Sequence, residues 1–564
     1  MTTKNLFLVK AVQVIEAVEL NCGPVDGAAP LRLEGQAGVT LFVGPNNCGK
    51  TALLEAIHYA FSGSGHSPQE LKKSALKKVR LHAFENKILD DHPALAGKEE
   101  EETVFFPRGH YSRMDFSKMS PRQWNEYMGG VFREPLCVWM NGAKRLAMLP
   151  AEEGADLQSP SGPLARLLTD DTRRKGFQTA AKAGIDYYPV IDTVSRYGTL
   201  KLAFASAAPD AETERSLNKS LIDYLKTALP AEHASDGFNA YTGMLGALHA
   251  SDFKVILIDE PEAFLHPTLA RTLGRQVAEK AGDKQVYIAT HSADFLMGAV
   301  ESGVPIRIVR LQYHAGVSTA RLLDNDTLRR LMNDPMMRSA NVLSGLFAQA
   351  VVVTEADADR AFYQEINNRL LSAKDPRGID NALFLNAHEK STVPRLVEPL
   401  RHMGVPTIGI VDLDVLAEGG ENWAKQMRAV GVPEVRRRTF ETARQSVFEL
   451  LRGVSTDGKQ KNYKQRGGVT LLSGGEKDAA EALLSDVEDY GLLVVSQGEL
   501  ESWLSNIEVD RDKHGWLRSI FDALGSDPND ANYVKPGDAD VWGFLGRARS
   551  WFADPARKGM VFEV

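Results

Sequence analysis

The sequence predicts an α/β protein made of two successive units, each built on a parallel sheet. The run at residues 255–258 is apolar without alternation and ends in two carboxylates. A similar run at residues 39–43 leads into a glycine-rich loop, and a third at residues 350–354 opens a new series of strands and helices. Unbroken apolar runs of this length are typical of strands that are buried on both faces of a parallel sheet.

Length and composition bound the class of protein. A chain of 564 residues is longer than one hydrophobic core can serve, so we expect several domains. Its hydrophobic content of 43% and charged content of 25% are ordinary for a soluble globular protein. The net charge of −8 does not indicate nucleic-acid binding. It does not exclude such binding either, because a local basic groove on an acidic protein is enough to bind a phosphate backbone.

Cysteine usage and hydropathy indicate the compartment. Cys22, Cys48 and Cys137 lack the spacing of a metal site, which favours a reducing cytosol and argues against zinc. The amino terminus has too short an apolar run for a signal peptide, and no window approaches the roughly 18 apolar residues of a membrane span. We therefore expect a cytoplasmic protein that does not contact a membrane.

The first functional element is a phosphate-binding loop. A strand expected at residues 39–43 runs into Gly44-Pro45-Asn46-Asn47-Cys48-Gly49-Lys50-Thr51, and a helix is expected at residues 52–60. In this pattern the glycines let backbone N–H groups turn toward phosphate oxygens, the lysine reaches the β and γ phosphates, and the threonine hydroxyl ligates Mg²⁺. The nucleotide ligands predicted here are Gly44, Asn46, Asn47, Gly49, Lys50 and Thr51.

The second functional element is the acidic pair after the run at residues 255–258. Asp259 and Glu260 emerge at the carboxyl end of this predicted strand, which is where doubly wound sheets bind ligands. There Asp259 can hold the Mg²⁺ of a bound nucleotide, and Glu260 can polarise an attacking water. The alternative is a strand end with a solvated acidic turn, and the loop upstream makes that alternative much weaker.

The order of motifs resembles that of ABC-type ATPases. In that family a Ser-x-Gly signature opens a helix before the acidic strand and contacts the γ phosphate held by the other subunit. Ser235 and Gly237 stand in this position, and His291, after a strand expected at residues 285–290, resembles the switch histidine that contacts the γ phosphate. The resemblance implies ATP as ligand, a composite site and a homodimer or larger homo-oligomer, with residues 262–267 near the dimer mate.

A second stretch matches the ABC signature in text only. Leu472-Ser473-Gly474-Gly475-Glu476 follows the acidic strand instead of preceding it, so we discount it as a signature. A serine three residues before a glutamate is a common start of a helix. We expect Ser473 to cap a helix at residues 476–484.

The second half of the chain carries acidic residues at successive strand ends. After a helical stretch at residues 326–346, strands are expected at residues 350–354, 382–386 and 406–411, with helices at 360–371 and 393–403 between them. Right-handed crossovers place the carboxyl ends of the first and third strands at one edge of the sheet. Glu355 and Asp359 follow the first strand, and Asp412 and Asp414 follow the third.

This constellation resembles a Toprim domain, the metal-binding module of topoisomerases, bacterial primases and OLD-family nucleases. Glu355, Asp412 and Asp414 match its Glu and Asp-x-Asp, and Asp359 falls where OLD-type members carry a second acid. The family has glycine where this chain has Ala356. The resemblance also implies a late acid, for which Glu499 and Glu501 after a fourth strand are alternatives on one strand face, and a downstream lysine, for which Lys535 is the first candidate and Lys513 the second.

Clustered carboxylates remain ionised together only when cations neutralise them, so this cluster predicts Mg²⁺ or Mn²⁺. Two such ions about 4 Å apart activate water and stabilise the leaving oxygen of a phosphodiester. The predicted ligands are Glu355, Asp359, Asp412, Asp414 and either Glu499 or Glu501. Basic residues nearby, at 436–438 and at 459–466, can steer a DNA backbone, although each is also compatible with plain solvent exposure.

The whole order resembles the OLD family of ATP-dependent nucleases, which includes the Gabija defence nuclease. We expect an ABC-type ATPase at residues 1–345, with its signature lobe and dimerisation elements within 62–240, and a Toprim nuclease with a C-terminal extension at 346–564. The resemblance implies metal-dependent DNA cleavage controlled by ATP, in antiphage defence or DNA repair, with a helicase or nuclease as a further partner.

Two alternatives remain open from the sequence. The first is a clamp resembling RecF or SMC heads, whose Toprim domain binds DNA or a partner without cleavage. The second is a primase-like polymerase, which ranks last because no zinc ribbon or nucleotidyl-transfer motif accompanies the acids. The tail at residues 538–564 is predicted to form a helix and a closing strand, and Trp503, Trp516, Trp542 and Trp551 are predicted to lie in the core.

Overall fold

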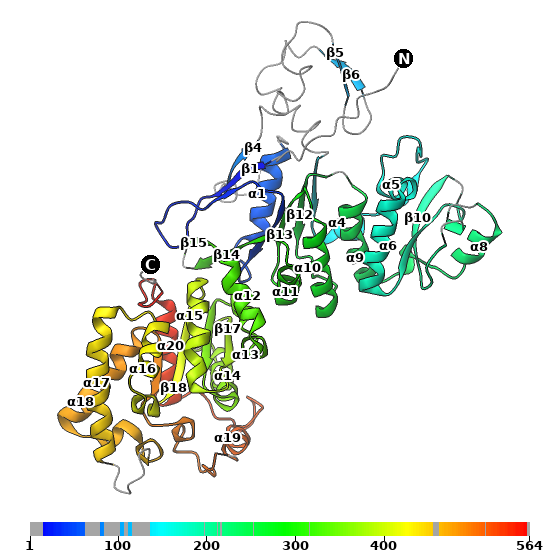
Figure 1. The fold of residues 1–564 in the computed structure, drawn as a ribbon. Helices are drawn as coiled ribbons and strands as arrows, with labels where there is room; N and C mark the ends of the chain where they lie inside the picture. The colour runs from blue at the N-terminus through cyan, green and yellow to red at the C-terminus, as the bar shows by residue number, and fades with distance from the viewer. Residues whose placement is uncertain are drawn as a thin grey trace. The chain divides into compact units, whose positions relative to one another are not determined.

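The computed structural model divides the chain into two compact units, residues 1–325 and 326–564 (Figure 1). It describes residues 15–62, 79–83, 102–105, 111–114, 136–196, 198–210, 213–214, 217–251, 253–314, 316–454, 462–513 and 515–560. The helical stretch after residue 325, which the sequence assigned to the first domain, lies in the second unit. The contact that places it there is made by η5 (Val342–Phe347), which packs on α15 (Val393–His402) and β17 (Ala382–Asn386).

A six-stranded sheet forms the centre of the first unit. Its order is β15-β14-β3-β13-β12-β7, and all neighbours are parallel except the β14–β15 pair at one edge. The strands expected around residues 39–43, 255–258 and 285–290 are confirmed as β3, β12 and β13. The strand bounds are β3 (Gly38–Val43), β7 (Cys137–Met140), β12 (Val255–Asp259), β13 (Gln285–Ala289), β14 (Ile306–His314) and β15 (Val317–Leu322).

Among the described residues of the first unit, three smaller antiparallel sheets are present besides the central one. The first has the order β2-β1-β4, the second joins β11, β10, β9 and β8, and the third is the pair β5-β6. The sequence pattern also favours a strand over residues 6–20; of these, residues 15–20 form β1, and the rest lie outside the described residues. The bounds are β1 (Ile15–Leu20), β2 (Arg32–Glu34), β4 (Val79–Ala83), β5 (Glu102–Phe105), β6 (Tyr111–Met114), β8 (Glu152–Glu153), β9 (Tyr188–Asp192), β10 (Thr199–Ala205) and β11 (Leu229–Pro230).

Helices cover the central sheet. The helix α1, which follows the glycine-rich loop, packs on β7, β12 and β13, and buries Leu54 and Ile57 against Phe42 and Leu257. Two other helices, α10 and α11, touch through glycine: a Cβ on Gly298 would lie 1.8 Å from the carbonyl oxygen of Arg271. The bounds are α1 (Lys50–Ser62), α4 (Gly142–Leu146), α5 (Pro163–Thr169), α6 (Asp171–Ile185), α8 (Lys219–Leu225), η4 (Ala231–His233), α9 (Asp236–His249), α10 (Pro267–Lys280) and α11 (Ala293–Glu301).

The second unit is built on a four-stranded parallel sheet of order β17-β16-β18-β19. Its strands are β16 (Ala350–Thr354), β17, β18 (Thr407–Asp412) and β19 (Leu492–Val495). Because the second strand in the chain lies on one side of the first and the third on the other, the chain reverses its winding direction between β16 and β18. Such a reversal point opens a crevice at the carboxyl ends of the two strands.

Helices surround this sheet on both faces (Figure 1). The single helical stretch predicted at 326–346 is broken by Pro335 and by Asn341, whose φ of +54° is left-handed. The other helices are α12 (Asn325–Asn333), α13 (Pro335–Ser339), α14 (Asp357–Ser372), η6 (Lys390–Thr392), η7 (Leu413–Ala417), α16 (Glu421–Ala429), α17 (Glu434–Gly453), η8 (Asn462–Gln465), η9 (Gly468–Leu471), α18 (Gly474–Glu488), η10 (Leu500–Ser502), α19 (Trp516–Leu524) and α20 (Val541–Ala553).

The core of the second unit contains the tryptophans predicted there. Trp503, Trp516, Trp542 and Trp551 are all at most 7% exposed and belong to one apolar cluster. The predicted closing strand is wrong for residues 554–560, which form turns, and its last residues lie outside the described chain. These turns are held by Arg401, whose buried guanidinium donates to the carbonyl oxygens of four residues, Thr407, Val430, Tyr490 and Gly559.

The predicted cap at Ser473 is only partly right. Ser473 occupies the N-cap position of α18, but its side chain makes no capping hydrogen bond. The textual signature thus lies in the second unit, whereas the six-stranded sheet belongs to the first.

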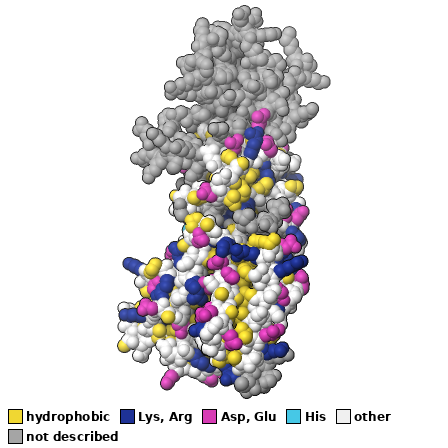
Figure 2. Space-filling view, turned by 90° about the vertical axis from the view of Figure 1, so that its left-hand side faces the viewer, with side chains coloured by type: hydrophobic (Ala, Val, Ile, Leu, Met, Phe, Trp, Pro, Cys, Tyr) yellow, Lys and Arg dark blue, Asp and Glu magenta, His cyan; other side chains and the backbone are white. Residues whose placement is uncertain are grey.

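Charge is mixed on the face of the second unit that Figure 2 shows, where Lys and Arg alternate with Asp and Glu. Among the described residues, no helix is both long and apolar enough to cross a membrane.

Candidate functional site

The glycine-rich loop is wound around its own lysine. Gly44, Asn47 and Gly49 have φ values of 145°, 62° and 94°. At Gly44 only glycine fits, because a Cβ would lie 2.1 Å from the carbonyl oxygen of Leu311. The Lys50 ammonium donates to the carbonyl oxygens of Gly44 and Pro45, both at 2.9 Å. A charged amine is thus held inside the loop at the start of α1, where helix N–H groups favour anions.

The acidic pair lies beside this loop, as predicted. Thr51 Oγ1 donates to Asp259 Oδ1 at 3.1 Å, which joins the start of α1 to the end of β12. Burial raises the pKa of Asp259, and the Thr51 hydroxyl partly offsets that effect. Glu260 follows in a left-handed conformation, with a φ of +50° and a half-exposed side chain. The hydroxyl and the carboxylate together present the oxygen ligands that Mg²⁺ prefers.

His291 lies next to the acidic pair. Its Nδ1 is 3.1 Å from Glu262 Oε1 and 3.5 Å from Glu260 Oε1. Glu262, which sequence reasoning placed only near a dimer interface, also accepts from the His291 N–H at 2.8 Å and from Thr290 Oγ1 at 2.9 Å. Glu262 therefore ties the turn after β12 to the turn after β13.

The predicted signature opens α9. Ser235 is the N-cap, and its hydroxyl accepts from the Phe238 N–H at 3.3 Å. Gly237 lies against the turn after β12, because a Cβ there would be 2.9 Å from the Phe264 carbonyl oxygen. Phe264 itself has a φ of +69° and a 58% exposed side chain. The signature serine is thus exposed at the start of a helix.

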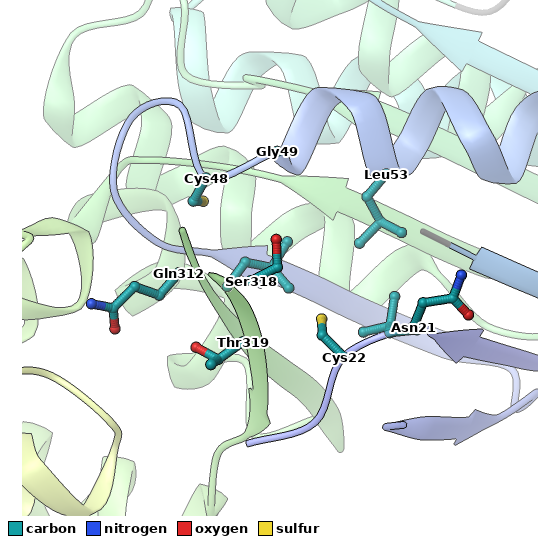
Figure 3. Close-up of a pocket in the computed structure, with 10 residues that line it drawn as sticks. Asn21, Cys22, Cys48, Gly49, Leu53, Gln312, Ser318 and Thr319 are labelled. Atoms are coloured by element: carbon teal, nitrogen blue, oxygen red, sulfur yellow. The ribbon is translucent and has the colours of Figure 1, made fainter. Parts of the chain in front are cut away.

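A pocket of about 190 Å³ borders the loop at Cys48 and Gly49 (Figure 3). Its opposite wall comes from Asn21 and Cys22 after β1 and from Ser318 and Thr319 on β15. Leu53 of α1 and Gln312 of β14 complete the labelled lining.

In the second unit, the first and third strands bring their acids together. A backbone ladder joins β16 to β18, and Glu355 Oε1 accepts from the Asp412 N–H at 2.9 Å. Burial and then the charge of Asp412 raise the pKa of Glu355 to about 8. Burial also raises the pKa of Asp412. The meeting of these two strand ends was predicted from the sequence.

Asp359 lies in the first turn of α14, beside the same strand end. Its Oδ2 accepts from the Ala356 N–H at 3.2 Å. Burial, the charge of Asp412 and the charge of Glu501 together raise the pKa of Asp359 to about 7. Ala356 has φ −133° and ψ 170°, an extended backbone that any residue adopts. Alanine in place of the family's glycine therefore costs this turn nothing.

Lysine amines lie among the remaining acids. Lys464 Nζ is 3.0 Å from Asp412 Oδ2, 3.4 Å from Asp414 Oδ2 and 3.3 Å from Glu499 Oε2. Lys390 Nζ pairs with Asp414 and is 3.7 Å from Glu418 Oε1. Burial lowers the pKa of Lys464, but the charges of Asp412 and Asp414 outweigh it and raise the pKa. Lys464 was known from the sequence only as part of a basic segment, and Lys390 had no assigned role.

The two late acids do not share a strand face, which corrects that expectation. The chain leaves β19 at Val495, Glu499 is a buried N-cap of η10, and Glu501 lies within that short helix. Lys513 Nζ is 3.3 Å from Glu499 Oε2. Lys535 is exposed, and no ion pair in the described chain joins it to the cluster. Its segment follows α19, and the structure does not bring it to these acids.

The donor set fits a hard divalent cation in chemistry. All the candidate ligands, with Glu499 and Glu501 as alternatives, offer carboxylate oxygens, which suit Mg²⁺ or Mn²⁺ better than zinc. In the part of the chain that the structure describes, no three such side chains are placed to hold a metal ion. Lysine amines are ion-paired with Asp414 and Glu499 in this arrangement.

Three family models match the chain. They are an AAA domain over residues 21–104, "AAA domain, putative AbiEii toxin, Type IV TA system" over residues 145–298, and "Overcoming lysogenization defect protein-like, TOPRIM domain" over residues 346–414. The chain carries AAA-type ATPase domains followed by an OLD-like Toprim domain, which matches the order expected for an ABC ATPase fused to Toprim. The match for the Toprim domain begins just before β16 and ends at Asp414, so it covers four of the six acids.

Solved structures similar to the ATPase–Toprim chain include SMC heads. The SmcHead bound to the C-winged helix domain of ScpA has 16% identity, a TM-score of 0.36 and coverage of 56% of this chain and 99% of that chain. The Smc head with an extended coiled coil, bound to a ScpA domain derived from Pyrococcus furiosus, has 14% identity, a TM-score of 0.34 and coverage of 56% and 98%. The head from Thermotoga maritima has 12% identity, a TM-score of 0.29 and coverage of 55% and 99%. No curated protein matches the sequence.

Proposed function

We propose that this protein is an ATP-dependent DNA endonuclease of the OLD family that requires Mg²⁺ or Mn²⁺ and serves antiphage defence or DNA repair. The observation that carries the proposal is the meeting of acids from β16, α14, β18 and η10 at the point where the Toprim sheet reverses its winding. Glu355 and Asp412 are in direct hydrogen-bond contact there. A structural role needs no such concentration of buried carboxylates, which burial makes costly.

In the ATPase domain, we assign the phosphates to the loop around Lys50, and the nucleoside to the pocket of Figure 3. Thr51 and Asp259 would hold Mg²⁺. Glu260 accepts the proton of the attacking water, and His291 contacts the γ phosphate. Ser235 of a second copy completes the site, because the serine is exposed and lies at a helix start that favours anions.

In the Toprim domain, Glu355, Asp359, Asp412, Asp414, Glu499 and Glu501 would hold the divalent cations. Bound there, the cations supply an activated water and stabilise the leaving oxygen of the phosphodiester. Asp412 is central, because it contacts Glu355 on one side and Lys464 on the other. Lys464 and Lys513 place positive charge beside the acids, where a DNA phosphate must approach.

Plasmid cleavage tests the proposal. Wild type, Asp412→Ala and the control Asp486→Ala, an exposed acid on α18, are incubated with Mg²⁺ or Mn²⁺, each with and without ATP. We expect the wild type and the control to cut and Asp412→Ala to be inactive. Equal cutting by Asp412→Ala would refute the assigned site, and the ATP arms give the sign of nucleotide control.

A second candidate is a RecF- or SMC-like clamp whose Toprim domain binds DNA or a partner without cleavage. The ion pairs of Lys390 and Lys464 favour it, because lysines can neutralise the acids permanently. Under this alternative, ATP is hydrolysed, DNA is retained in a binding assay, and no metal condition produces cleavage. These outcomes separate it from the nuclease.

A further inference from the structure

Arg145 is a buried arginine beside the ATPase acids that none of the motifs includes. It lies in the short helix α4, directly after β7, and is 2% exposed. Its guanidinium donates to the backbone carbonyl oxygen of Glu260, which is 115 residues away in the chain. Burial lowers the pKa of Arg145, and the charges of Glu262, Asp259 and Glu260 oppose that effect. Arg145 is therefore a buried cation whose charge interacts with all three carboxylates of this turn.

Arg145 is poorly satisfied as a purely structural arginine. Its Nε is buried and has no hydrogen-bond partner in the described chain. Arg174 of α6 is equally buried at 2% exposure, yet its Nε pairs with Glu214, its Nη1 with Leu167 and Leu168, and its Nη2 with Asp171. An unsatisfied buried donor costs stability, so its presence calls for an explanation other than stability.

The backbone that Arg145 holds is strained. Glu260 has a φ of +50°, an unfavourable conformation for a residue with a side chain. Its N–H donates to the Ala289 carbonyl at 2.8 Å, and its carbonyl accepts from the Ala263 N–H at 3.0 Å as well as from Arg145. The direction of the Glu260 carboxylate is thus set by backbone contacts on both sides of the residue.

Arg145 also contacts the signature helix. Its own carbonyl oxygen would lie 2.3 Å from a Cβ on Gly243, so α4 and α9 are in backbone contact at this glycine. The same helix α9 begins at Ser235 and Gly237. A displacement of α9 must therefore displace the backbone of Arg145, because close-packed backbones have no space to absorb it.

We propose that Arg145 is a positioning residue that aims the Glu260 carboxylate and couples it to the signature helix α9. Its side chain fixes the carbonyl of the strained Glu260, and its main chain rests on Gly243. When a ligand at Ser235 moves α9, the shift reaches Glu260 through Arg145. This inference rests on the proposed role of Glu260 in polarising water.

Steady-state ATP hydrolysis and ATP affinity in the full-length chain test the inference. Arg145→Met should lower kcat by about 10²-fold, the cost of a small misplacement of a reacting group, and leave KM and the Kd for ATP within about threefold. Arg145→Lys, which retains one donor, should recover part of kcat. Glu260→Gln is the reference variant, which should still bind ATP but no longer hydrolyse it.

Arg174→Met is the matched control, because it removes a buried arginine from the same unit whose acidic partners are Glu214 and Asp171, not the acids of the turn at Glu260. It should lower the unfolding temperature but leave kcat of the folded protein unchanged. The inference is overturned if Arg145→Met hydrolyses ATP at the wild-type rate, or if both arginine variants lose kcat in proportion to their loss of stability. If Glu260→Gln hydrolyses ATP at the wild-type rate, the proposed role of Glu260 is refuted, and this outcome is independent of the Arg145 variants.

Discussion

Lys464 Nζ lies 3.0 Å from Asp412 Oδ2, so a lysine amine is ion-paired with the carboxylate at the centre of the Toprim acids. It also reaches Asp414 and Glu499 within 3.4 Å. A lysine and a divalent cation that need the same oxygens compete, and the lysine must withdraw for the cation to bind. At the proposed cation site, Lys464 would therefore set part of the metal affinity.

Replacing Lys464 should change cation binding in a defined direction. We expect Lys464→Met to bind Mn²⁺ about tenfold more tightly than the wild type by isothermal titration calorimetry without nucleotide, a change of about 1.4 kcal/mol. Lys477→Met, which removes an exposed lysine that pairs only with Glu481 on α18, should match the wild type. Weaker Mn²⁺ binding by Lys464→Met would mean that the lysine organises the site instead of competing for it.

The buried acids predict that stability without metal falls as pH rises. Glu355 and Asp359 have folded-state pKa values of about 8 and about 7, above their ordinary values of 4.5 and 3.8. The folded protein therefore keeps protons that the unfolded chain releases, and this contribution to stability is lost as pH rises toward 8. In EDTA, the Toprim unfolding transition should lose on the order of 3–4 kcal/mol between pH 6 and pH 8.

Thermal unfolding at these two pH values checks that expectation. Mg²⁺ should remove most of the pH dependence, because a bound cation compensates the carboxylates. Glu355→Gln, which cannot ionise, should show a smaller pH dependence than the wild type in EDTA. A wild-type protein that gains stability between pH 6 and pH 8 in EDTA would contradict the raised pKa values.

Two glycines of the chain predict opposite effects of the same substitution. Gly298→Ala places a methyl group 1.8 Å from the Arg271 carbonyl oxygen, so α10 and α11 must separate, at a cost of about 1–3 kcal/mol in the stability of the ATPase domain. Gly475→Ala in the first turn of α18 meets no atom within 4 Å, and should stabilise the Toprim domain by about 0.5–1 kcal/mol. Chemical denaturation measures both changes. Equal effects of the two variants would show that α10 and α11 are not in backbone contact.

Blocking hydrolysis should trap a dimer. Glu260→Gln is expected to bind ATP, to hydrolyse it at least about 10²-fold more slowly, and to elute as a dimer when ATP is present. Adding Ser235→Arg should abolish the dimer without preventing ATP binding, since the serine acts on the nucleotide of the other subunit. Light scattering after gel filtration gives the mass. A monomer that retains ATP in Glu260→Gln would refute the composite site.

Sequence patterns predicted those features that depend on neighbouring residues. The loop at Gly44–Thr51, the strand end at Asp259 and the acids after β16 and β18 were predicted, because each follows an apolar strand directly. The meeting of Glu355 with Asp412 was also predicted, since right-handed crossovers leave few alternatives for parallel strands.

The missed residues act across long sequence separations. Lys464 is 52 residues from Asp412, and Arg145 is 115 residues from Glu260. No local sequence pattern can predict contacts over such separations. Lys535 was chosen only because of the family resemblance, and the sequence around it contains no pattern that predicts a place near the acids. The basic segment around residue 464 was visible, but only the fold shows that one of its lysines turns inward to the acids.

Arg401 has a consequence for how the second unit depends on residues that lie outside its sheet. Its guanidinium binds the carbonyl oxygens of four residues that are far apart in the chain, among them Thr407 and Gly559. Without Gly559 this buried cation loses one acceptor, and a buried donor left unsatisfied costs about 1–3 kcal/mol. Loss of the turn at Gly559 should therefore weaken the sheet that carries the acids, although that turn contributes no strand to it.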